Sequence, residues 1–358
     1  MVAVKEKEAE GRIRVAQSSE LMRFVQEVLV KVGVPSSDAH IVADCLLTAN
    51  LSGIDSHGVV RLAHYIRRLK NGTIKARPAL KFEQTAPASG IMDGADGLGH
   101  VITYHACTRA MEMAEEIGSG TVVVKNSSHF GMAGFYLKRI ATEGYAGIMM
   151  TPTDAFLIPF GGRRAFFGTN PVAVGFPTDG IPVILDMSTT SIPFGKIALA
   201  QKEGRTIPAD WGFNEKGEPE TNPTEIVGLH PIAGAKGSGI AMIIDIFGSI
   251  LSGMPWGPYI NKMYLEMEQP RKLGHFIYVL DIKRLMPLEQ FKKRLGLMLR
   301  ELNAMPPAEG FDRVYYPGQI EGERRRQREA QGIPIEPGLY QELEELGERF
   351  KVPFPDGE

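Results

Sequence analysis

The chain has 358 residues, of which 43% are hydrophobic and 23% charged, and its formal net charge is −2. This composition is typical of a globular protein, and the length suffices for one large domain or two to three smaller ones. The small net charge argues against a nucleic-acid or acidic-membrane binder, because such proteins need a basic surface. The two cysteines, Cys45 and Cys107, lie in apolar helical patterns. No disulfide framework is therefore predicted, and a reducing, cytoplasmic location is expected.

Helices are predicted for the first 75 residues. Residues 1–16 are polar and charged without the apolar run of a secretory signal, so they are interpreted as a tail. Apolar residues at helical spacing then predict a helix from about 18 to 32, a second one after Ser36, and a third from about Ser56 to Asn71.

From Pro78 onward strands alternate with helices, which predicts an α/β core flanked by helices from both chain ends. The predicted strands are 80–84, 89–93, 121–125, 146–151, 182–186 and 276–280, and the predicted helices are 102–117, 132–143, 189–202, 287–303, 322–330 and 337–350. A long apolar helix from about residue 237 is expected to be buried. Its apolar stretch, 239–254, contains an aspartate and is short for a membrane span. Residues 159–182 are rich in Gly and Pro, and 205–231 are expected to be a polar excursion outside the core.

Several common motifs are missing. The sequence has no G-x-G-x-x-G, P-loop, H-E-x-x-H, C-x-x-C or G-x-S-x-G run. A standard dinucleotide-binding fold, a kinase, a zinc enzyme and a serine hydrolase are all disfavoured, and no metal site is predicted. Two runs have the spacing G-x-x-G-x-G instead, at 94–99 and 234–239.

The segment from Ser56 to Tyr65 is the first candidate site. If it is helical, His57, Arg61 and Tyr65 lie four residues apart on one face. An imidazole, a guanidinium and a phenol together suit a substrate carboxylate. The alternative is a capped helix with a solvated polar face.

Two more candidates directly follow predicted strands, where sites of α/β proteins usually lie. His129 follows the TVVV strand and could act as a general base, because its unperturbed pKa of about 6.5 suits proton transfer. Asp154 follows the next strand and could orient an imidazole. The alternatives are a loop histidine and a turn aspartate that each cap a neighbouring element.

Gly- and Thr-rich turns at 160–171 and 186–190 could bind ribose or phosphate, although such turns are common. The run 234–239 enters the apolar helix, and its amides, with Lys236 and Gly237, could bind a pyrophosphate. The alternative is a flexible entry loop with a surface lysine. The basic run 324–328 is interpreted as a solvated helix face, because acidic residues flank it.

Seven blocks in order give the chain a resemblance, which extends over about residues 18–340, to the type-2 malate/L-lactate dehydrogenase family, which includes ureidoglycolate and sulfolactate dehydrogenases. They are DSHGVVRL (55–62), SSHFG (127–131), PFGG (159–162), GTNP (168–171), LDMSTT (185–190), AGAKGSG (233–239) and VYYPGQ (314–319). The segment 205–231 is most similar to the ureidoglycolate-type members.

The resemblance implies a non-Rossmann, three-layer fold with a mixed sheet and a homodimer or higher oligomer with the active site near the subunit interface. It implies a helical substrate-binding and dimerisation domain, 17–77 with 305–358, and a nucleotide-binding domain, 78–304. His129 is implied as the acid/base with Asp154 beside it, and the substrate residues implied are Ser56, His57, Arg61 and Tyr65. The implied nucleotide contacts are Thr153, Asp186, Met187, Ser188, Lys236, Gly237 and, on a looser match, Arg294.

The function predicted is hydride transfer between NAD, or alternatively NADP, and a small 2-hydroxy or 2-oxo acid. Neither a nucleic-acid nor a membrane partner is expected. Two alternatives stay open: a cofactor-free lyase or hydrolase that uses the same His, Asp and Arg residues, and a non-catalytic ligand-binding protein. The identity of the acid, the choice between NAD and NADP and the direction of the reaction are not predicted.

Overall fold

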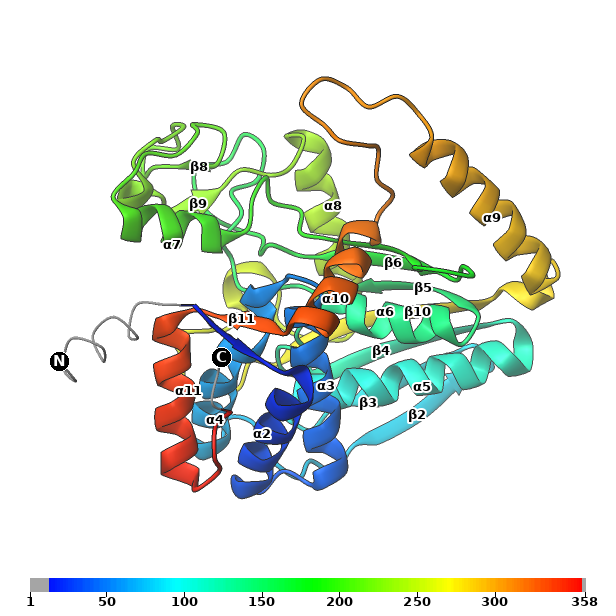
Figure 1. The fold of residues 1–358 in the computed structure, drawn as a ribbon, viewed down its shortest axis with the longest axis horizontal. Coiled ribbons are helices and arrows are strands. Elements are labelled where there is room, and N and C mark those ends of the chain that lie inside the picture. Colours follow the sequence, from blue (N-terminus) through cyan, green and yellow to red (C-terminus); the bar gives the residue numbers. More distant parts are fainter. Residues whose placement is uncertain (1–12, 356–358) are drawn as a thin grey trace. The chain divides into compact units, whose positions relative to one another are not determined.

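The computed structural model describes residues 13–355, which form two compact units (Figure 1). One unit runs to Arg77 and resumes at Gln319, and the other spans Pro78–Gly318. The segment 1–16, predicted as a tail, lies mostly outside the described residues. Its last three residues, Arg14–Ala16, form strand β1.

The first unit is helical. Its elements are β1, α2 (Ser18–Lys31), α3 (Ser36–Leu51), α4 (Leu62–Lys70), α10 (Gln319–Gln331), β11 (Ile333–Ile335) and α11 (Pro337–Phe350). Helix α3 packs on α2 and α10, α11 packs on α2, and β1 pairs antiparallel with β11. The third predicted helix was wrong at its start, because two 3₁₀ turns, η1 (Asp55–His57) and η2 (Val59–Arg61), precede α4.

The second unit is built on a mixed sheet of seven strands, which confirms the predicted fold class. In spatial order these are β2 (Lys81–Ala86), β3 (Ser89–Asp93), β4 (Ser119–Ser127), β10 (Leu273–Asp281), β5 (Tyr145–Met150), β6 (Val172–Phe176) and β7 (Val183–Met187). Strands β3 and β4 pair in parallel, and every other neighbouring pair in this sheet is antiparallel. Strand β6 was not predicted, because it lies inside the Gly- and Pro-rich stretch.

Helices cover the sheet as the alternating pattern predicts. Helix α5 (Gly99–Ile117) packs on β4 and β10, and α6 (Ala133–Thr142) packs on β5 and β6 (Figure 1). The remaining helices are α7 (Phe194–Glu203), α8 (Ala235–Asp245) with its π-helical continuation η4 (Ile246–Ile250), and α9 (Leu288–Asn303). The 3₁₀ turns η3 (Pro223–Glu225), η5 (Gly257–Tyr259) and η6 (Ile282–Arg284) complete this unit together with β8 (Gly212–Phe213) and β9 (Gly228–Leu229).

The segment 205–231 was predicted to lie outside the core, and that prediction was wrong. It contains the β8–β9 pair, and its Ile207 and Leu229 join Ile192, Ile197 and Ala200 in a small buried cluster. Its polar residues occupy the turns around that cluster. The polar composition of the segment therefore reflects its turns, and it gave no indication that Ile207 and Leu229 are core residues.

One end of the sheet collects most of the motifs. Strands β3, β4, β5 and β7 run in the same direction, because an antiparallel strand separates β4 from β5 and another separates β5 from β7. Their carboxyl ends therefore lie at one edge, where strands β10 and β6 begin. The runs 94–99, 125–131, 151–154, 168–171 and 187–190 all meet at this edge.

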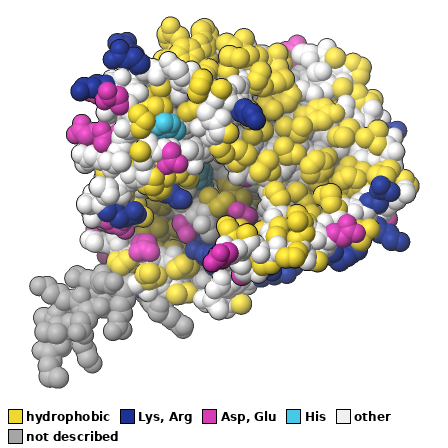
Figure 2. Space-filling model, turned by 90° about the horizontal axis from the view of Figure 1, so that it is seen from above, with side chains coloured by type: hydrophobic (Ala, Val, Ile, Leu, Met, Phe, Trp, Pro, Cys, Tyr) yellow, Lys and Arg dark blue, Asp and Glu magenta, His cyan; other side chains and the backbone are white. Residues whose placement is uncertain are grey.

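Helix α8 was expected to be buried, and that expectation was wrong. Its inner side carries the buried Ala241, Ile244 and Asp245, but its outer side exposes Ile240, Met242 and Ile243 to 42–47%. The π-helical segment continues this apolar surface with Ile246 and Ile250, and Leu251 follows directly after it. Figure 2 shows hydrophobic side chains gathered over one broad face of the molecule. Among residues 13–355, no helix is both long and apolar enough to cross a membrane.

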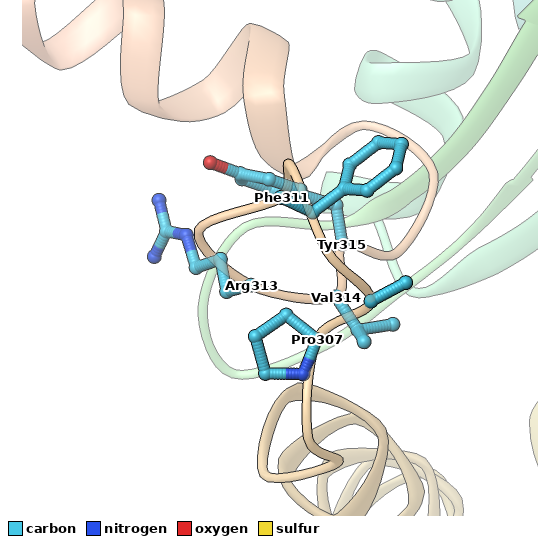
Figure 3. A pocket seen from close by; sticks show the side chains of 6 residues that line it. Pro307, Phe311, Arg313, Val314 and Tyr315 are labelled. Carbon is cyan, nitrogen blue, oxygen red and sulfur yellow. The ribbon is translucent and has the colours of Figure 1, made fainter.

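The segment between α9 and α10 folds back on the sheet of the second unit. The Ile184 amide donates to Pro317 O over 3.0 Å, and the Tyr316 hydroxyl donates to Ile181 O over 3.3 Å. The preceding residues line a small hollow of about 300 Å³ between Pro307 and Tyr315 (Figure 3). That hollow contains none of the predicted site residues.

Candidate active site

His129 lies in the loop that leaves β4. Its Nδ1 accepts a hydrogen bond from the Gly131 amide over 3.3 Å, which orients the ring within its own loop. The neighbouring Ser128 is buried, and its hydroxyl donates to Gly97 O over 2.9 Å and accepts from the Gly99 amide over 2.8 Å. The first Gly-rich run, 94–99, therefore supports the His129 loop.

Gly99 provides a test of this support. A Cβ atom there would lie 2.2 Å from Ser128 O and 2.6 Å from His129 O, both of which are backbone atoms. We expect Gly99→Ala to shift residues 128–129, to destabilise the fold by about 1–3 kcal/mol and to lower kcat by roughly tenfold or more. Turnover and thermal unfolding measure both effects.

Gly338→Ala is the matched control for Gly99→Ala, because nothing lies within 4 Å of a Cβ at that helical position. It should leave turnover near the wild-type value. Wild-type kcat in the Gly99 variant would show that the close contact with the His129 loop is unimportant.

Thr153 and Asp154 follow β5. The Thr153 amide donates to Asn170 Oδ1 over 3.0 Å, and its hydroxyl accepts from the Thr169 amide over 2.8 Å. The Asp154 carboxylate forms an ion pair with Arg271 over 2.8 Å and accepts from the Met263 amide over 3.3 Å. The Arg271 side chain is only 2% exposed. Sequence reasoning missed Arg271, which lies 117 positions from Asp154 and in no recognisable motif.

At the end of β7, Asp186 binds a helix. Its carboxylate accepts from the Gly134 amide over 2.7 Å, in the first turn of α6, where an anion is favoured. Met187 and Ser188 follow at the same edge of the sheet, and the Ser188 and Thr190 hydroxyls lie 3.1 Å apart. This edge therefore presents hydroxyl groups beside a carboxylate that orders α6.

The second Gly-rich run begins α8, as the sequence predicts. Lys236 is exposed in the first turn, and Gly237 is buried. A side chain at position 237 would not fit, because a Cβ there would lie 2.0 Å from Ile232 O. The amides of this first turn and the Lys236 ammonium form a donor set that fits a phosphate group. At Gly239, no atom lies within 4 Å of the Cβ position.

Asn170, from the GTNP run, ties α8 to the Thr153 loop. It is fully buried with a φ of +31°, and its Nδ2 donates to Ala241 O over 2.9 Å and to Asp245 Oδ1 over 3.3 Å. Asp245 is 3% exposed, and burial raises the pKa of its carboxyl to about 7.

A pH-dependent stability follows from Asp245. The pKa of this carboxyl is higher in the folded chain than its unfolded value of 3.8. The protonated carboxyl therefore adds to the free energy of unfolding below pH 4, and this contribution is lost as the pH rises through 7. Asp245→Asn keeps an oxygen for Asn170 and removes the ionisation. We expect the variant to be more stable than wild type at pH 8, by up to roughly 4 kcal/mol, and to differ little at pH 4. Urea unfolding at the two pH values measures this.

The exposed Glu215 provides the control for Asp245, because Glu215→Gln should show no such growth of the stability difference with pH. An equal effect of Asp245→Asn at pH 4 and pH 8 would contradict the buried ionisation.

The first unit holds the segment that contains Ser56, His57, Arg61 and Tyr65. Gly58 separates the two 3₁₀ turns, so the predicted single helical face was wrong. The side chains are nevertheless coupled. The Ser56 hydroxyl lies 3.0 Å from His57 Nδ1, Arg61 Nε donates to Ser56 O over 2.6 Å, and the Arg61 charge acts electrostatically on His57 and Tyr65.

Burial sets the charge of this segment. It lowers the pKa of His57 to about 4, with a further contribution from the Arg61 charge. Burial also raises the pKa of the fully buried Tyr65 hydroxyl. His57 and Tyr65 are therefore neutral near pH 7, while the arginine keeps its proton. Arg61 supplies the positive charge, and His57 and Tyr65 supply hydrogen-bonding groups.

Arg328 holds this segment in place, which corrects the prediction of a solvated basic face. Its NH1 and NH2 donate to the Asp55 carboxylate over 2.7 and 3.0 Å, and NH1 also donates to Asn50 O. The Asn50 side chain donates to Asp55 over 2.7 Å and accepts from the Val59 amide over 2.8 Å. Arg326 on the same helix is exposed. Arg328 is buried, and Arg325 is partly buried and donates to the Thr48 hydroxyl over 3.4 Å, a distinction that a run of arginines cannot reveal.

Arg294 lies on α9, beside a groove of about 560 Å³ lined mainly by Met286, Phe291, Leu295, Leu297 and Met298. The Arg294 side chain is exposed. The predicted contact of Arg294 with the nucleotide stays a prediction.

Comparison with known proteins identifies the family. The family model for malate/L-lactate dehydrogenase matches residues 16–344. The chain belongs to the malate/L-lactate dehydrogenase family. Malate dehydrogenase from Pyrococcus horikoshii is 35% identical over 96% of this chain and 97% of its own length. Ureidoglycolate dehydrogenase (NAD(+)) from Escherichia coli O157:H7 is 34% identical over 90% and 93%, respectively.

Solved structures of family members have the same fold. Malate dehydrogenase from Entamoeba histolytica superposes with a TM-score of 0.91 at 30% identity, over 96% of this chain and 100% of that one. Sulfolactate dehydrogenase from Methanocaldococcus jannaschii gives 0.90 at 32% identity, over 97% and 99%. Membership of the malate/L-lactate dehydrogenase family supports a 2-hydroxy acid dehydrogenase. The relatives differ in the acid they are named for.

Proposed function

We propose that this chain catalyses reversible hydride transfer between a nicotinamide nucleotide and a small 2-hydroxy acid. The observation that carries the proposal is the edge of the seven-stranded sheet, where the His129 loop, Thr153, Asp154 and Ser188 gather. Family membership supports the same reaction class. A cofactor-free lyase and a simple binding protein are disfavoured, because neither needs a phosphate-binding helix start together with a histidine at a strand end.

The nucleotide fits the donor set of the second unit. The first-turn amides of α8, Lys236 and Gly237 would hold its pyrophosphate, and the Thr153 loop, Asp186, Met187 and Ser188 would border the rest. When bound, the nicotinamide supplies the hydride acceptor or donor. NAD is the cofactor we propose, because the predicted nucleotide contacts include only one arginine for a ribose 2′-phosphate, Arg294, and that contact rests on a looser match than the others. NADP is the alternative.

The protein's own residues bind the acid and move a proton. We propose that Arg61 binds the substrate carboxylate and that neutral His57 and Tyr65 add hydrogen bonds. His129 takes the hydroxyl proton during oxidation and returns it during reduction.

Asp154 has a supporting role in the proposal. Its carboxylate forms an ion pair with the buried Arg271, and we propose that its negative charge stabilises the protonated form of His129. Asp154 is therefore proposed to raise the basicity of His129.

A homodimer is also proposed. The exposed apolar side chains of α8 and the π-helical segment form a surface that a second copy would bury. Sedimentation measures the mass directly, and a monomer at micromolar concentration would contradict the homodimer.

Steady-state turnover with NADH or NADPH and a panel of 2-oxo acids tests the proposed reaction. A fluorescence titration with each nucleotide tests the cofactor without requiring the correct acid.

A further inference from the structure

We propose that His275 is a positioning residue that couples the loop carrying His129 to the loop carrying Thr153. It lies near the start of β10, the strand between β4 and β5, and its side chain is fully buried. Neither a motif nor the family blocks point to it. The inference rests on the proposed roles of His129 in proton transfer and of the Thr153 loop in nucleotide binding.

The imidazole connects two strand ends. Its Nε2 lies 2.8 Å from Ser127 Oγ at the end of β4, and its Nδ1 lies 2.8 Å from Thr151 Oγ1 just after β5. Ser127 precedes His129 by two residues, and Thr151 precedes Thr153 by two residues. One buried ring therefore fixes the spacing of the two loops.

A neutral imidazole suits this connection. It has one donor and one acceptor nitrogen, and each hydroxyl can complete the complementary bond. Burial lowers the pKa of His275 to about 3, so the ring keeps this neutral form throughout the working range. The Phe130 ring packs edge-on against it at 4.7 Å, and the Phe130 carbonyl accepts from the Tyr136 hydroxyl over 2.6 Å. The ring is therefore enclosed on the side of the His129 loop as well.

Two substitutions of His275 each remove one of its two hydrogen bonds and keep the other. His275→Asn places its terminal amide at the depth of Nδ1, so it can keep the Thr151 bond but cannot reach Ser127. His275→Gln extends to the depth of Nε2, so it can keep the Ser127 bond while the Thr151 bond is lost. Both variants retain a polar, uncharged side chain at the buried position.

The expected results differ between these variants. His275→Asn should lower kcat by roughly 10–100-fold, through displacement of the His129 loop, and leave the NADH dissociation constant near wild type. His275→Gln should raise the NADH dissociation constant by roughly 3–10-fold and keep kcat within about threefold. Ser127→Ala should reproduce the first pattern and Thr151→Val the second, so the test does not depend on a single variant folding well.

Equal losses of kcat and NADH affinity in both histidine variants, in proportion to their lower thermal stability, would overturn the proposal and leave His275 a core residue. A wild-type chain that neither binds NADH nor reduces any 2-oxo acid would instead contradict the proposed function. In that case thermal unfolding can still test whether His275 links Ser127 to Thr151 through its two hydrogen bonds. Non-additive shifts for His275→Asn with Ser127→Ala, and for His275→Gln with Thr151→Val, would support it, because both substitutions of a pair remove the same bond, and additive shifts would overturn it.

Discussion

Replacing His129 by alanine should lower kcat by roughly 100- to 10,000-fold, because the variant lacks the group that exchanges the proton with the substrate hydroxyl. The loss should appear in both reaction directions, since the same imidazole acts as base in oxidation and as acid in reduction. NADH affinity should stay near the wild-type value, because His129 is not among the proposed nucleotide contacts. Turnover and a fluorescence titration measure the two quantities on the same preparation.

Two further variants test whether the effect of His129→Ala comes from the loss of a proton-exchanging group. His129→Gln preserves polarity and most of the side-chain volume but cannot be protonated, so it should be almost as inactive as the alanine variant. His40→Ala removes an exposed histidine on α3 and should retain wild-type turnover. Near-normal kcat in folded His129→Gln would assign the proton transfer to another group.

Replacing Arg328 by methionine should weaken substrate binding through a different route. The change leaves the Asp55 carboxylate and the Asn50 carbonyl without the guanidinium that binds both. Because Asp55 is 48% exposed, we expect a stability loss of about 2 kcal/mol, less than for a fully buried pair. The larger effect should be on KM for the acid, roughly tenfold or more, because the turns with His57 and Arg61 lose their anchor.

Arg326→Met is the matched control for Arg328→Met, because it removes an exposed arginine from the same helix. It should change neither stability nor KM appreciably. Arg328→Lys should restore part of the stability but little of the KM, since lysine cannot replace both guanidinium bonds. Unchanged KM in Arg328→Met, despite lower stability, would contradict the anchoring role.

Elements with a strong local pattern could be predicted from the sequence. The β-branched run before His129 predicted β4, and the periodic segments predicted α9 and α11 closely. Strand β6 could not be predicted, because Pro171 and the surrounding glycines conceal a short strand that is defined by its neighbours in the sheet. Exposure of α8 could not be predicted either, because an apolar helix gives the same pattern whether a partner or its own core covers it.

The residues of the candidate site also divide into those that the sequence predicted and those that it did not. His129, Thr153, Asp154 and Ser188 were found because each follows a strand, and the strand directions bring them to one edge. Arg271, His275 and Arg328 were missed because each acts through a partner more than 100 positions away. A signal existed for His275, since a lone histidine in the apolar run LGHFIYVL requires buried hydrogen-bond partners. The sequence contained nothing to identify those partners as Ser127 and Thr151.

The most direct test of the account is the loss of reduced-nicotinamide absorbance when the purified chain is mixed with NADH or NADPH and a 2-oxo acid. Oxaloacetate, pyruvate, oxalurate, sulfopyruvate and 2-oxoglutarate cover the acids that the family suggests, and the corresponding hydroxy acids test the reverse direction. The account predicts rapid oxidation of NADH with at least one of these acids, abolished in His129→Ala. Folded protein that binds neither nucleotide and oxidises neither with any acid would contradict it.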